Sequence, residues 1–366
     1  MDFIKRVTLT ALSLSIVAVW GCASIGPGNI TRDRFDYTAA VADSWKSQML
    51  LNLVKIRYGD APVFLDVGQI VAGYSFQRNI GATAGTSAFN SGPPPHAAIG
   101  TFGLSGQGSY NDSPTVTYSP MTGERFARSL MMPIPPSVIL NLIQAGSPVE
   151  EVFRTSVQSI NGVDNRRVGR LYVRRANPEF YALLPNLERL QLSGDIGMRV
   201  QQVGQEPKLH MIFRPKTAAA EENALRNAAK ILGLDPSARE FQVVYGTVAS
   251  NDKEIALLTR SILEILTDIA SYITVPEAHV TERRVRPTTE GDVGPRGPIP
   301  PLIRITSSAE CPAAAFVAVP YLGYCFSIDN RDLPSKQSFS SIMFLFTFVE
   351  TGSKEAAPVL TIPTTR

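Results

Sequence analysis

The three histidines are the first residues to consider for chemistry, because imidazole is a common general base and metal ligand. His96 lies beside a proline-rich turn, His210 in a strand-like segment and His279 after a helix-like segment. They are too far apart in sequence to form a metal motif, and HExxH, paired CxxC and GxSxG sequences are absent. We therefore predict that the protein is not an enzyme and needs no metal or cofactor. A hydrolase with dispersed catalytic residues is the least favoured hypothesis.

Cys22 has a clearer chemical context, because it closes the sequence AVWGCAS at residues 18–24. A basic start at Lys5 and Arg6 and an uncharged, largely apolar run over 7–20 precede it. These parts are typical of a secretory signal peptide, and the apolar run is shorter than the roughly 20 residues of a membrane-spanning helix. The sequence therefore predicts export from the cytoplasm.

The four residues VWGC, ending at Cys22, resemble the lipobox of bacterial lipoprotein precursors. The resemblance implies that the Cys22 thiol is diacylated, that the chain is cleaved before it, and that the new amine is acylated. Ala23 follows where an aspartate would favour the inner membrane, so the resemblance implies the periplasmic face of the outer membrane. Two alternatives stay open: an ordinary signal peptide with an incidental cysteine, and an uncleaved anchor.

The two other cysteines, Cys311 and Cys325, are 14 residues apart. In an oxidising compartment such a pair can form a disulfide that contributes up to about 3 kcal/mol. Cys325 also lies in an apolar, strand-like run, so two separate buried thiols remain the alternative.

The composition describes a folded chain with no nucleic-acid partner. Hydrophobic residues make up 44% and charged residues 18%, and the net charge is only +3. That composition supports a substantial core, whereas nucleic-acid binding normally requires a strong basic excess. Partners are instead expected in the envelope: the membrane through the lipid anchor, other copies of this chain, or other envelope proteins.

Residues 73–118 predict a long, glycine-rich β-hairpin. Apolar residues alternate with small polar ones in two arms, and period-two alternation indicates strands with one apolar face. The sequence NSGPPP at 90–95 predicts the turn between them. The apolar positions with the largest side chains, candidates for contact with membrane or partner, are Tyr74, Phe76, Ile80, Phe102, Leu104 and Tyr110.

Three hypotheses fit this hairpin. It is a long soluble flap, a membrane-inserting hairpin of an oligomer, or a disordered glycine-rich loop. Each arm exceeds the roughly 9–11 residues that cross a membrane as a tilted strand, but one hairpin in lipid leaves its edges unpaired and needs a ring of protomers. Arg78 on the apolar face argues against insertion, since a charge near the midplane costs about 2–4 kcal/mol. The glycines also weaken strands.

The remaining chain predicts an α+β fold: an N-terminal helix, the hairpin, a small helical cluster and a mixed α/β periplasmic body. A helix is expected after the polar residues 251–254, and residues 164–175, which contain five arginines, are expected to form a solvated edge or, alternatively, a patch for anionic lipid or an acidic partner. The predicted boundaries are signal peptide 1–21, lipidated tether 22–36, helix with hairpin and helical cluster 37–163, α+β domain 164–280, proline- and glycine-rich linker or loop 281–301, C-terminal strands and buried helix 302–352, and tail 353–366.

Two stretches, SWKSQMLLNLVKIRYGDAPVFLDV and GYCFSIDNRDLPSKQSFSSIMFLF, resemble envelope lipoproteins of proteobacteria whose activity is uncharacterised. The resemblance assigns no role to any residue. The expected function is that of a structural or assembly subunit of an envelope complex, which becomes an oligomeric pore or export channel if each protomer inserts its hairpin. The alternative is a periplasmic binding module for a lipid, glycan or peptide.

Overall fold

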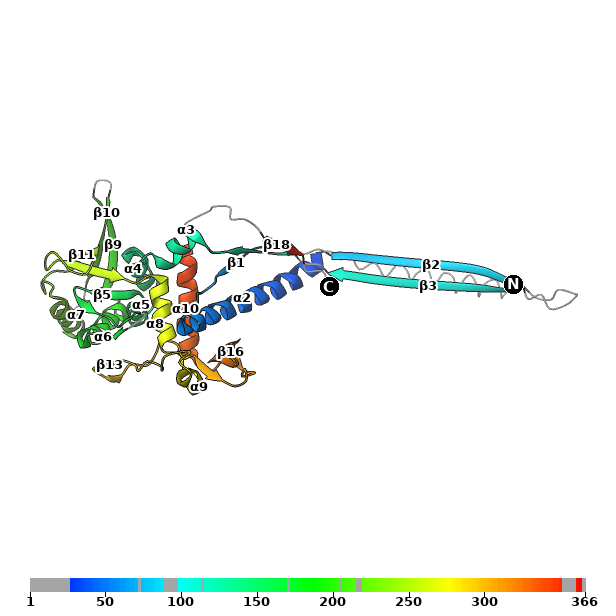
Figure 1. Ribbon diagram of the computed structural model, residues 1–366. Coiled ribbons are helices and arrows are strands. Elements are labelled where there is room, and N and C mark those ends of the chain that lie inside the picture. Colours follow the sequence, from blue (N-terminus) through cyan, green and yellow to red (C-terminus); the bar gives the residue numbers. More distant parts are fainter. Residues whose placement is uncertain are drawn as a thin grey trace, which may run out of the picture.

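The computed structural model describes residues 27–71, 74–88, 98–112, 115–169, 172–203, 206–214, 219–350 and 360–363. The predicted α+β class is confirmed, since helices accompany several small sheets along this part of the chain. Figure 1 shows a body of helices and sheets from which one long hairpin projects.

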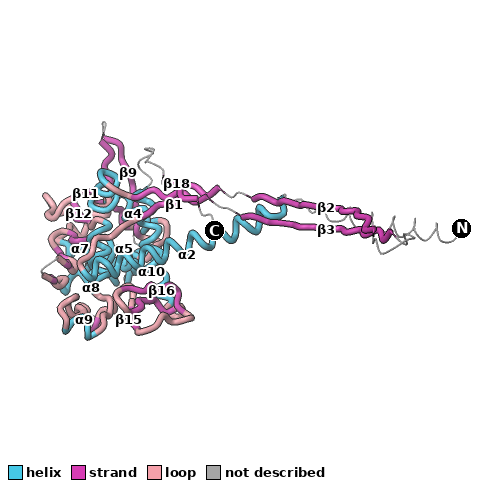
Figure 2. The backbone as a smooth tube through the Cα atoms, turned by 45° about the vertical axis from the view of Figure 1, so that its right-hand side comes forward, coloured by secondary structure: helices cyan, strands magenta, loops and turns pink. Residues whose placement is uncertain are grey.

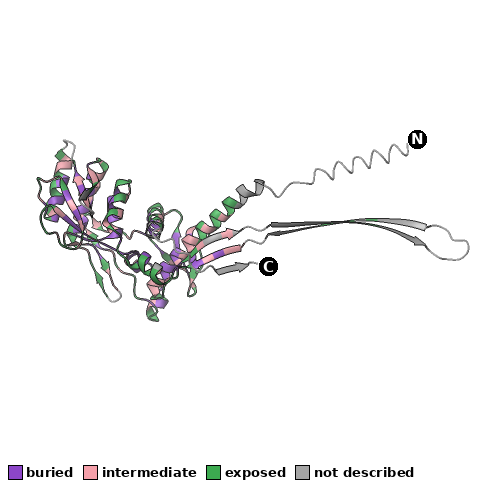
Figure 3. Cartoon of the chain, turned by 90° about the horizontal axis from the view of Figure 1, so that it is seen from above, coloured by how far each residue is buried: buried purple, intermediate pink, exposed green. Residues whose placement is uncertain are grey.

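The first described helix, α2 (Pro27–Tyr58), has 32 residues and is about 48 Å long. It begins ten residues earlier than predicted, so residues 27–36 are helical and the predicted tether over 22–36 is wrong in that part. Proline suits a first helical position, because its missing N–H would have no partner there. The end of α2 enters the core through Met49, Leu50 and Leu53, whereas most of its residues between 34 and 44 are exposed (Figure 3).

A two-stranded ribbon follows α2 and leads out of the body (Figure 2). The strand pair next to the body and the strand pair beyond it continue in one register, since Val71 pairs with Thr115 and Tyr74 with Asp112. The register shifts once, beside Gly68. The strands are β1 (Leu65–Val71), β2 (Tyr74–Ala88), β3 (Ala98–Asp112) and β4 (Thr115–Pro120).

The predicted C-terminal tail over 353–366 needs a correction. Within it, β18 (Leu360–Pro363) pairs antiparallel with β4 and makes a three-stranded sheet in the order β1-β4-β18. The open edge of β4 explains the pairing, because its backbone groups had no strand on that side.

The helical cluster after the ribbon ends at Ser156, the last residue of α5. The next four residues form a fully buried strand, β5. Pairing with β12 takes precedence over local helix periodicity here. The elements are α3 (Gly123–Phe126), the π-helical turn η1 (Ala127–Met131), α4 (Pro136–Gln144), α5 (Val149–Ser156) and β5 (Val157–Ile160).

The largest sheet has six strands in the order β6-β5-β12-β11-β10-β9. β11 and β12 are parallel, and the other neighbouring pairs are antiparallel. Helix α4 contacts β9, β11 and β12, and α6 packs against α7. The remaining bounds are β6 (Val163–Asp164), α6 (Pro178–Leu192), β9 (Ile196–Val203), β10 (Glu206–Phe213), α7 (Ala219–Leu232), β11 (Glu240–Tyr245) and β12 (Glu254–Thr259).

The helix expected directly after residues 251–254 is wrong at its start. Residues 254–259, at the expected start of the helix, form the strand β12. The helix α8 (Ile262–Ser271) begins only after Ser261. Ser261 and Glu264 form a reciprocal capping box, which satisfies backbone N–H groups at the helix start. The pairs Val243↔Ile255 and Leu258↔Ser159 hold the preceding residues in the sheet.

The described C-terminal region after α8 contains a short helix, a two-stranded sheet, a three-stranded sheet and a long helix. Helix α10 was predicted to be buried, but only one face is: Phe339, Ile342 and Phe346 are buried, whereas Phe344 is 65% exposed. The elements of this region are α9 (Glu277–Thr281), β13 (Val293–Gly294), β14 (Gly297–Pro298), β15 (Thr306–Ser308), β16 (Ala315–Tyr321), β17 (Tyr324–Asp329) and α10 (Leu333–Glu350). A separate short pair, β7 (Arg167–Val168) and β8 (Val173–Arg174), lies earlier in the chain, between β6 and α6.

A continuous set of buried apolar side chains connects these parts, from the end of α2 through α4, α6 and α8 to α10. Each fully buried large apolar side chain contributes about 1.5–3 kcal/mol. In the part of the chain that the structure describes, no helix combines the length and the hydropathy needed to cross a bilayer.

Candidate functional site

The hairpin β2–β3 brings the predicted apolar positions of both arms onto one face. Directly paired residues lie on the same face of a two-stranded sheet, and the register pairs Phe76 with Tyr110, Ala84 with Phe102 and Ala82 with Leu104. Tyr74 and Ile80 share this face, since they lie an even number of residues from Phe76. All six candidate residues therefore lie on one face, and the hypothesis of a disordered loop is wrong for residues 74–88 and 98–112.

The outer part of the hairpin is free of charged residues. Residues 79–88 and 98–107 contain no Asp, Glu, Lys or Arg, and each segment is about ten residues long. Ten residues match the length of a strand that crosses a membrane at a tilt. Arg78 pairs with Gly108, close to the start of β2, and therefore lies at the border of this uncharged span and not at its middle. Arg78 is therefore a weaker argument against insertion than the sequence suggested, because the free-energy cost of a charge in the membrane falls to about 0–1 kcal/mol near an interface.

The opposite face of the hairpin is built from small and hydroxyl residues. Thr83 Oγ1 donates to the carbonyl oxygen of Gly103 at 3.3 Å, and Ser105 Oγ donates to that of Gly81 at 3.2 Å. A Cβ atom added to Gly81 or Gly103 would lie 2.8 Å from the hydroxyl opposite it. These glycines therefore permit cross-strand hydrogen bonds, which gives the glycine content a structural reason.

The start of α2 lies beside the base of the hairpin, and the views in Figures 1 and 2 agree on this. Pro27 follows Cys22 by five residues, a distance of at most about 18 Å for an extended chain. Cys22, the predicted lipidation site, lies outside the described residues. Phe35 of α2 is 70% exposed near this end of the molecule, and Tyr74, Phe76 and Tyr110 stand at the hairpin base. Aromatic residues at the end of an uncharged strand segment are typical of segments that meet a membrane–water interface.

The two described histidines, His210 and His279, lie apart from each other. Among the described residues, no group of three or more His, Cys, Asp or Glu side chains could hold a metal ion. His210 of β10 has its Nδ1 3.5 Å from Oε1 of Glu240 on β11, and His279 Nδ1 lies 2.8 Å from the hydroxyl of Tyr58 in a different part of the molecule. His96 lies outside the described residues.

A buried ion cluster between α8 and residues 165–166 is the main polar feature that the sequence did not predict. Arg166 Nε lies 3.2 Å from Asp268 Oδ1, and Arg260 Nη1 lies 3.4 Å from Asp268 Oδ2. Asp292 lies 3.8 Å from Arg166 Nη1 and accepts a 2.9 Å hydrogen bond from the hydroxyl of Tyr181. Both arginines are only 2% exposed. The two positive and two negative charges compensate one another.

This cluster is built to hold the fold together. Burial raises the pKa of Tyr181, and the carboxylate of Asp292 raises it further, so the hydroxyl stays protonated and donates. Arg166 also stacks 4.3 Å from the ring of Tyr272, and the adjoining cavity of about 20 Å³ has room for no more than a water molecule. The cluster thus lacks the space for an organic ligand.

The arginine-rich stretch 164–175 is therefore only partly an exposed edge. Arg166 is buried, contrary to both surface hypotheses, because it compensates Asp268 and Asp292. The arginines at 167, 174 and 175 are at least half exposed, and each lies within ion-pair distance of an acidic side chain. Arg170 lies outside the described residues.

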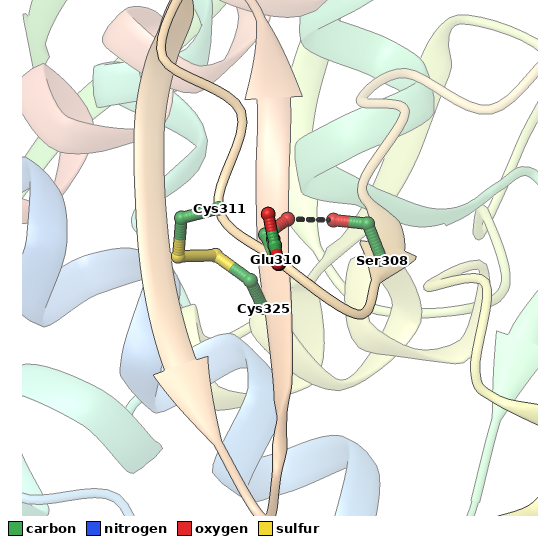
Figure 4. Close-up of a disulfide and its surroundings, with 4 residues drawn as sticks. All are labelled: Ser308, Glu310, Cys311 and Cys325. Atoms are coloured by element: carbon green, nitrogen blue, oxygen red, sulfur yellow. Dashed lines mark hydrogen bonds between the residues drawn. A yellow bond between two sulfur atoms is a disulfide. The ribbon is translucent and has the colours of Figure 1, made fainter.

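The structure contains the disulfide between Cys311 and Cys325, with their Cα atoms 5.1 Å apart. It joins the loop after β15 to β17 (Figure 4). Ser308 Oγ donates to the carbonyl oxygen of Glu310 at 2.6 Å in the same loop. The disulfide and this hydrogen bond constrain a loop on the body, far in sequence from the hairpin.

Comparisons of this chain with protein-family models, with curated proteins and with solved structures found no match. Function must therefore be argued from the geometry, and the hairpin β2–β3, with its uncharged outer part, is the most specific feature of that geometry.

Proposed function

We propose that this chain is a lipoprotein of the outer membrane, anchored through Cys22, and that several copies insert their hairpins side by side to form a pore or export channel. The main support is the hairpin itself: two arms in one register, each with about ten uncharged residues and one apolar face. The position of α2 adds support, because an anchor five residues before it would hold the hairpin base at the membrane surface.

The requirement for several copies comes from the backbone. Among the described residues, the sheet β2–β3 has two strands and hence two open edges. Each unpaired N–H or C=O group in lipid costs several kcal/mol, so the edges must pair with other hairpins. Closed sheets that cross the outer membrane have at least about eight strands, which corresponds to about four or more copies. The apolar face would contact lipid, and the face with Thr83 and Ser105 would face water.

The experiment compares two arginine variants on adjacent residues of β3. Phe102→Arg places the charge on the apolar face near the middle of the uncharged span, where it costs about 2–4 kcal/mol. Thr101→Arg places the same charge on the polar face. We expect mature wild-type protein in mild detergent to run at the size of four or more copies and to conduct ions in planar bilayers. Phe102→Arg should lower the inserted fraction at least 30-fold, whereas Thr101→Arg should insert and shift the pore toward anions.

Deletion of residues 74–112 should abolish conductance and leave the body folded by circular dichroism. A wild-type chain that runs as a monomer, with a hairpin fully open to protease in the presence of liposomes, would contradict the proposal and favour a periplasmic binding module. Equal effects of the two arginine variants would also contradict it, since they differ only in the face that carries the charge.

The anchor is tested separately by radiolabelled palmitate. Wild-type protein should incorporate the label, and Cys22→Ser should not. Two acyl chains hold a protein on a bilayer far longer than one, so the variant should also leave the membrane fraction unless the hairpin retains it. Equal labelling of both proteins would show that Cys22 is not the modified residue.

A further inference from the structure

The strand β9 forms an open edge of the six-stranded sheet. The sheet order ends at β9, and no other described strand pairs with its outer side. Two residues separate β9 from β10, and the register makes Val203↔Glu206 the pair next to that turn. In a two-residue hairpin this pair is hydrogen-bonded, so Val200, three positions earlier, directs its N–H outward. Figures 1 and 3 show the β9–β10 hairpin projecting from the body.

An apolar pocket of about 450 Å³ lies beside this edge. Ile196 and Met198 of β9 form one side of it and are half-buried. The other walls come from α4, β10 and the end of α6, through Leu140, Ile143, Met211 and Leu192. The volume falls in the range of pockets that bind ligands or anchor side chains.

Exposed apolar side chains continue the pocket toward solvent. Leu192 at the rim is 82% exposed, and Val200 is 56% exposed. Val200 lies on the same face of β9 as Met198 and Ile196, because residues two apart share a face. A groove of apolar side chains thus runs along β9, directly beneath its unpaired backbone groups.

We infer that this groove binds an extended segment of another polypeptide, which adds to β9 as a seventh strand and places apolar side chains, at every second position, into the pocket. The open edge determines the occupant. Its N–H and C=O groups are satisfied by a strand, whereas an acyl chain would fill the pocket and leave the edge unpaired. The inference does not depend on whether the hairpin β2–β3 enters a membrane.

The lining of the pocket is largely apolar, and one of its polar side chains is engaged within the fold. The side-chain amide of Gln191 is already used: it donates to the carbonyl oxygens of Ile143 and Ser147 and accepts from the N–H of Val149. Gln144 and Glu188 also line the pocket, and the other side chains of the lining are apolar, as alternate apolar side chains of an added strand require.

The experiment uses a phage-displayed library of random ten-residue peptides, selected on the full mature chain in mild detergent. We expect the enriched sequences to carry apolar residues at every second position. A synthetic enriched peptide should lose at least tenfold in affinity for Leu192→Asp and for Val200→Pro. Proline at 200 removes an outward N–H and leaves the hydrogen bonds to β10 in place. Val248→Asp is the matched control, since Val248 is 78% exposed and does not line the pocket, and it should bind like wild type.

Both variants change exposed residues, and unchanged circular dichroism and urea midpoints would verify their folding; if Val200→Pro unfolds, Leu192→Asp carries the test. Enriched peptides without the two-residue period, or peptides that bind Leu192→Asp as tightly as wild type, would overturn the inference. Self-association of the wild type that Leu192→Asp abolishes, with no enriched peptide that depends on Leu192, would assign the edge to a second copy and overturn the inference as well.

Discussion

Replacement of Asp268 by asparagine tests the buried ion cluster most directly. Asp268 is the carboxylate that Arg166 and Arg260 share, at 3.2 and 3.4 Å. Asparagine keeps the shape and removes the charge, so two guanidinium groups that are each 2% exposed would have only Asp292 as a buried counter-ion. Removing one partner of a buried ion pair costs about 3–5 kcal/mol, because the remaining charge stays desolvated.

The assay is urea unfolding of the full mature chain in mild detergent, followed by far-UV circular dichroism. We expect Asp268→Asn to lower the free energy of unfolding by about 3–5 kcal/mol, and each kcal/mol should lower the Tm by about 2–4 °C for a domain of 150–250 residues. The matched control is Arg331→Gln, which removes an exposed ion pair with Asp329 at 2.9 Å. Exposed pairs contribute little to stability, so this variant should unfold like the wild type.

A double-mutant cycle with Arg260→Met makes the test specific. In the described structure, Arg260 has one ion-pair partner, Asp268. The loss of stability caused by Asp268→Asn should therefore be smaller in the Arg260→Met background, by about 0.5–3 kcal/mol. A loss below 1 kcal/mol for Asp268→Asn, or strict additivity in the cycle, would refute the reasoning that these charges depend on each other.

Three further predictions concern the same body. Replacing both Cys311 and Cys325 by serine should lower the free energy of unfolding by up to about 3 kcal/mol, since the disulfide closes a 14-residue separation; addition of reductant to the wild type should give the same loss, and no loss in either case would contradict the prediction. Ser261→Ala should cost about 0.5–2 kcal/mol, because Ser261 Oγ accepts the Glu264 N–H at 3.2 Å at the start of α8; Ser250→Ala, a serine in a nearby turn, serves as the control. Hydrogen bonds from the side chain and backbone of Arg331 lower the pKa of Asp329 to about 2, so the stabilisation by this carboxylate is complete above about pH 4 and is lost as the pH falls through 2. An NMR titration of Arg331→Gln should show the pKa of Asp329 rising toward about 3.9, and an unchanged value would reject that cause.

The hairpin was predictable because its signals are local. Alternation of apolar and polar residues in 74–84 and 98–110 defines two one-sided strands, and the proline turn between them sets which residues meet. The apolar positions read separately from the two arms coincide in the register, as in the pair Phe76↔Tyr110. The buried stripe of α2 follows from three- and four-residue spacing in the same way.

The start of α8 was missed because two local signals competed. Asn251 to Glu254 has the composition of a helix start, and the apolar spacing from Leu258 to Ile269 continues into α8. The pairing of residues 254–259 with β11 and β5 decided the outcome, and no local pattern reveals such partners. Ser261 and Glu264, a capping box in the sequence, could have located the true start.

The ion cluster and the open edge were not predictable for a related reason. Arg166 and Asp268 are 102 residues apart, and a run of arginines normally indicates an exposed surface. The exposure of Leu192 and the pocket beside Met198 depend on strand order, which places β9 last in the sheet. Sequence periodicity assigns a strand its faces, but it does not determine which strand lies at the edge.

The two proposed surfaces lie at opposite ends of the molecule, and this arrangement has a mechanical consequence. The hairpin extends to one end, with the start of α2 beside its base, and the six-stranded sheet is at the other end (Figure 1). Because the last third of α2 is fixed in the core by residues such as Met49 and Leu53, a chain held by its hairpin and anchor would present β9 well outside the bilayer, with the part of α2 before Met49, roughly 33 Å long, as a spacer. A partner strand could then bind the sheet without contact with lipid, so insertion and docking need not compete for the same face.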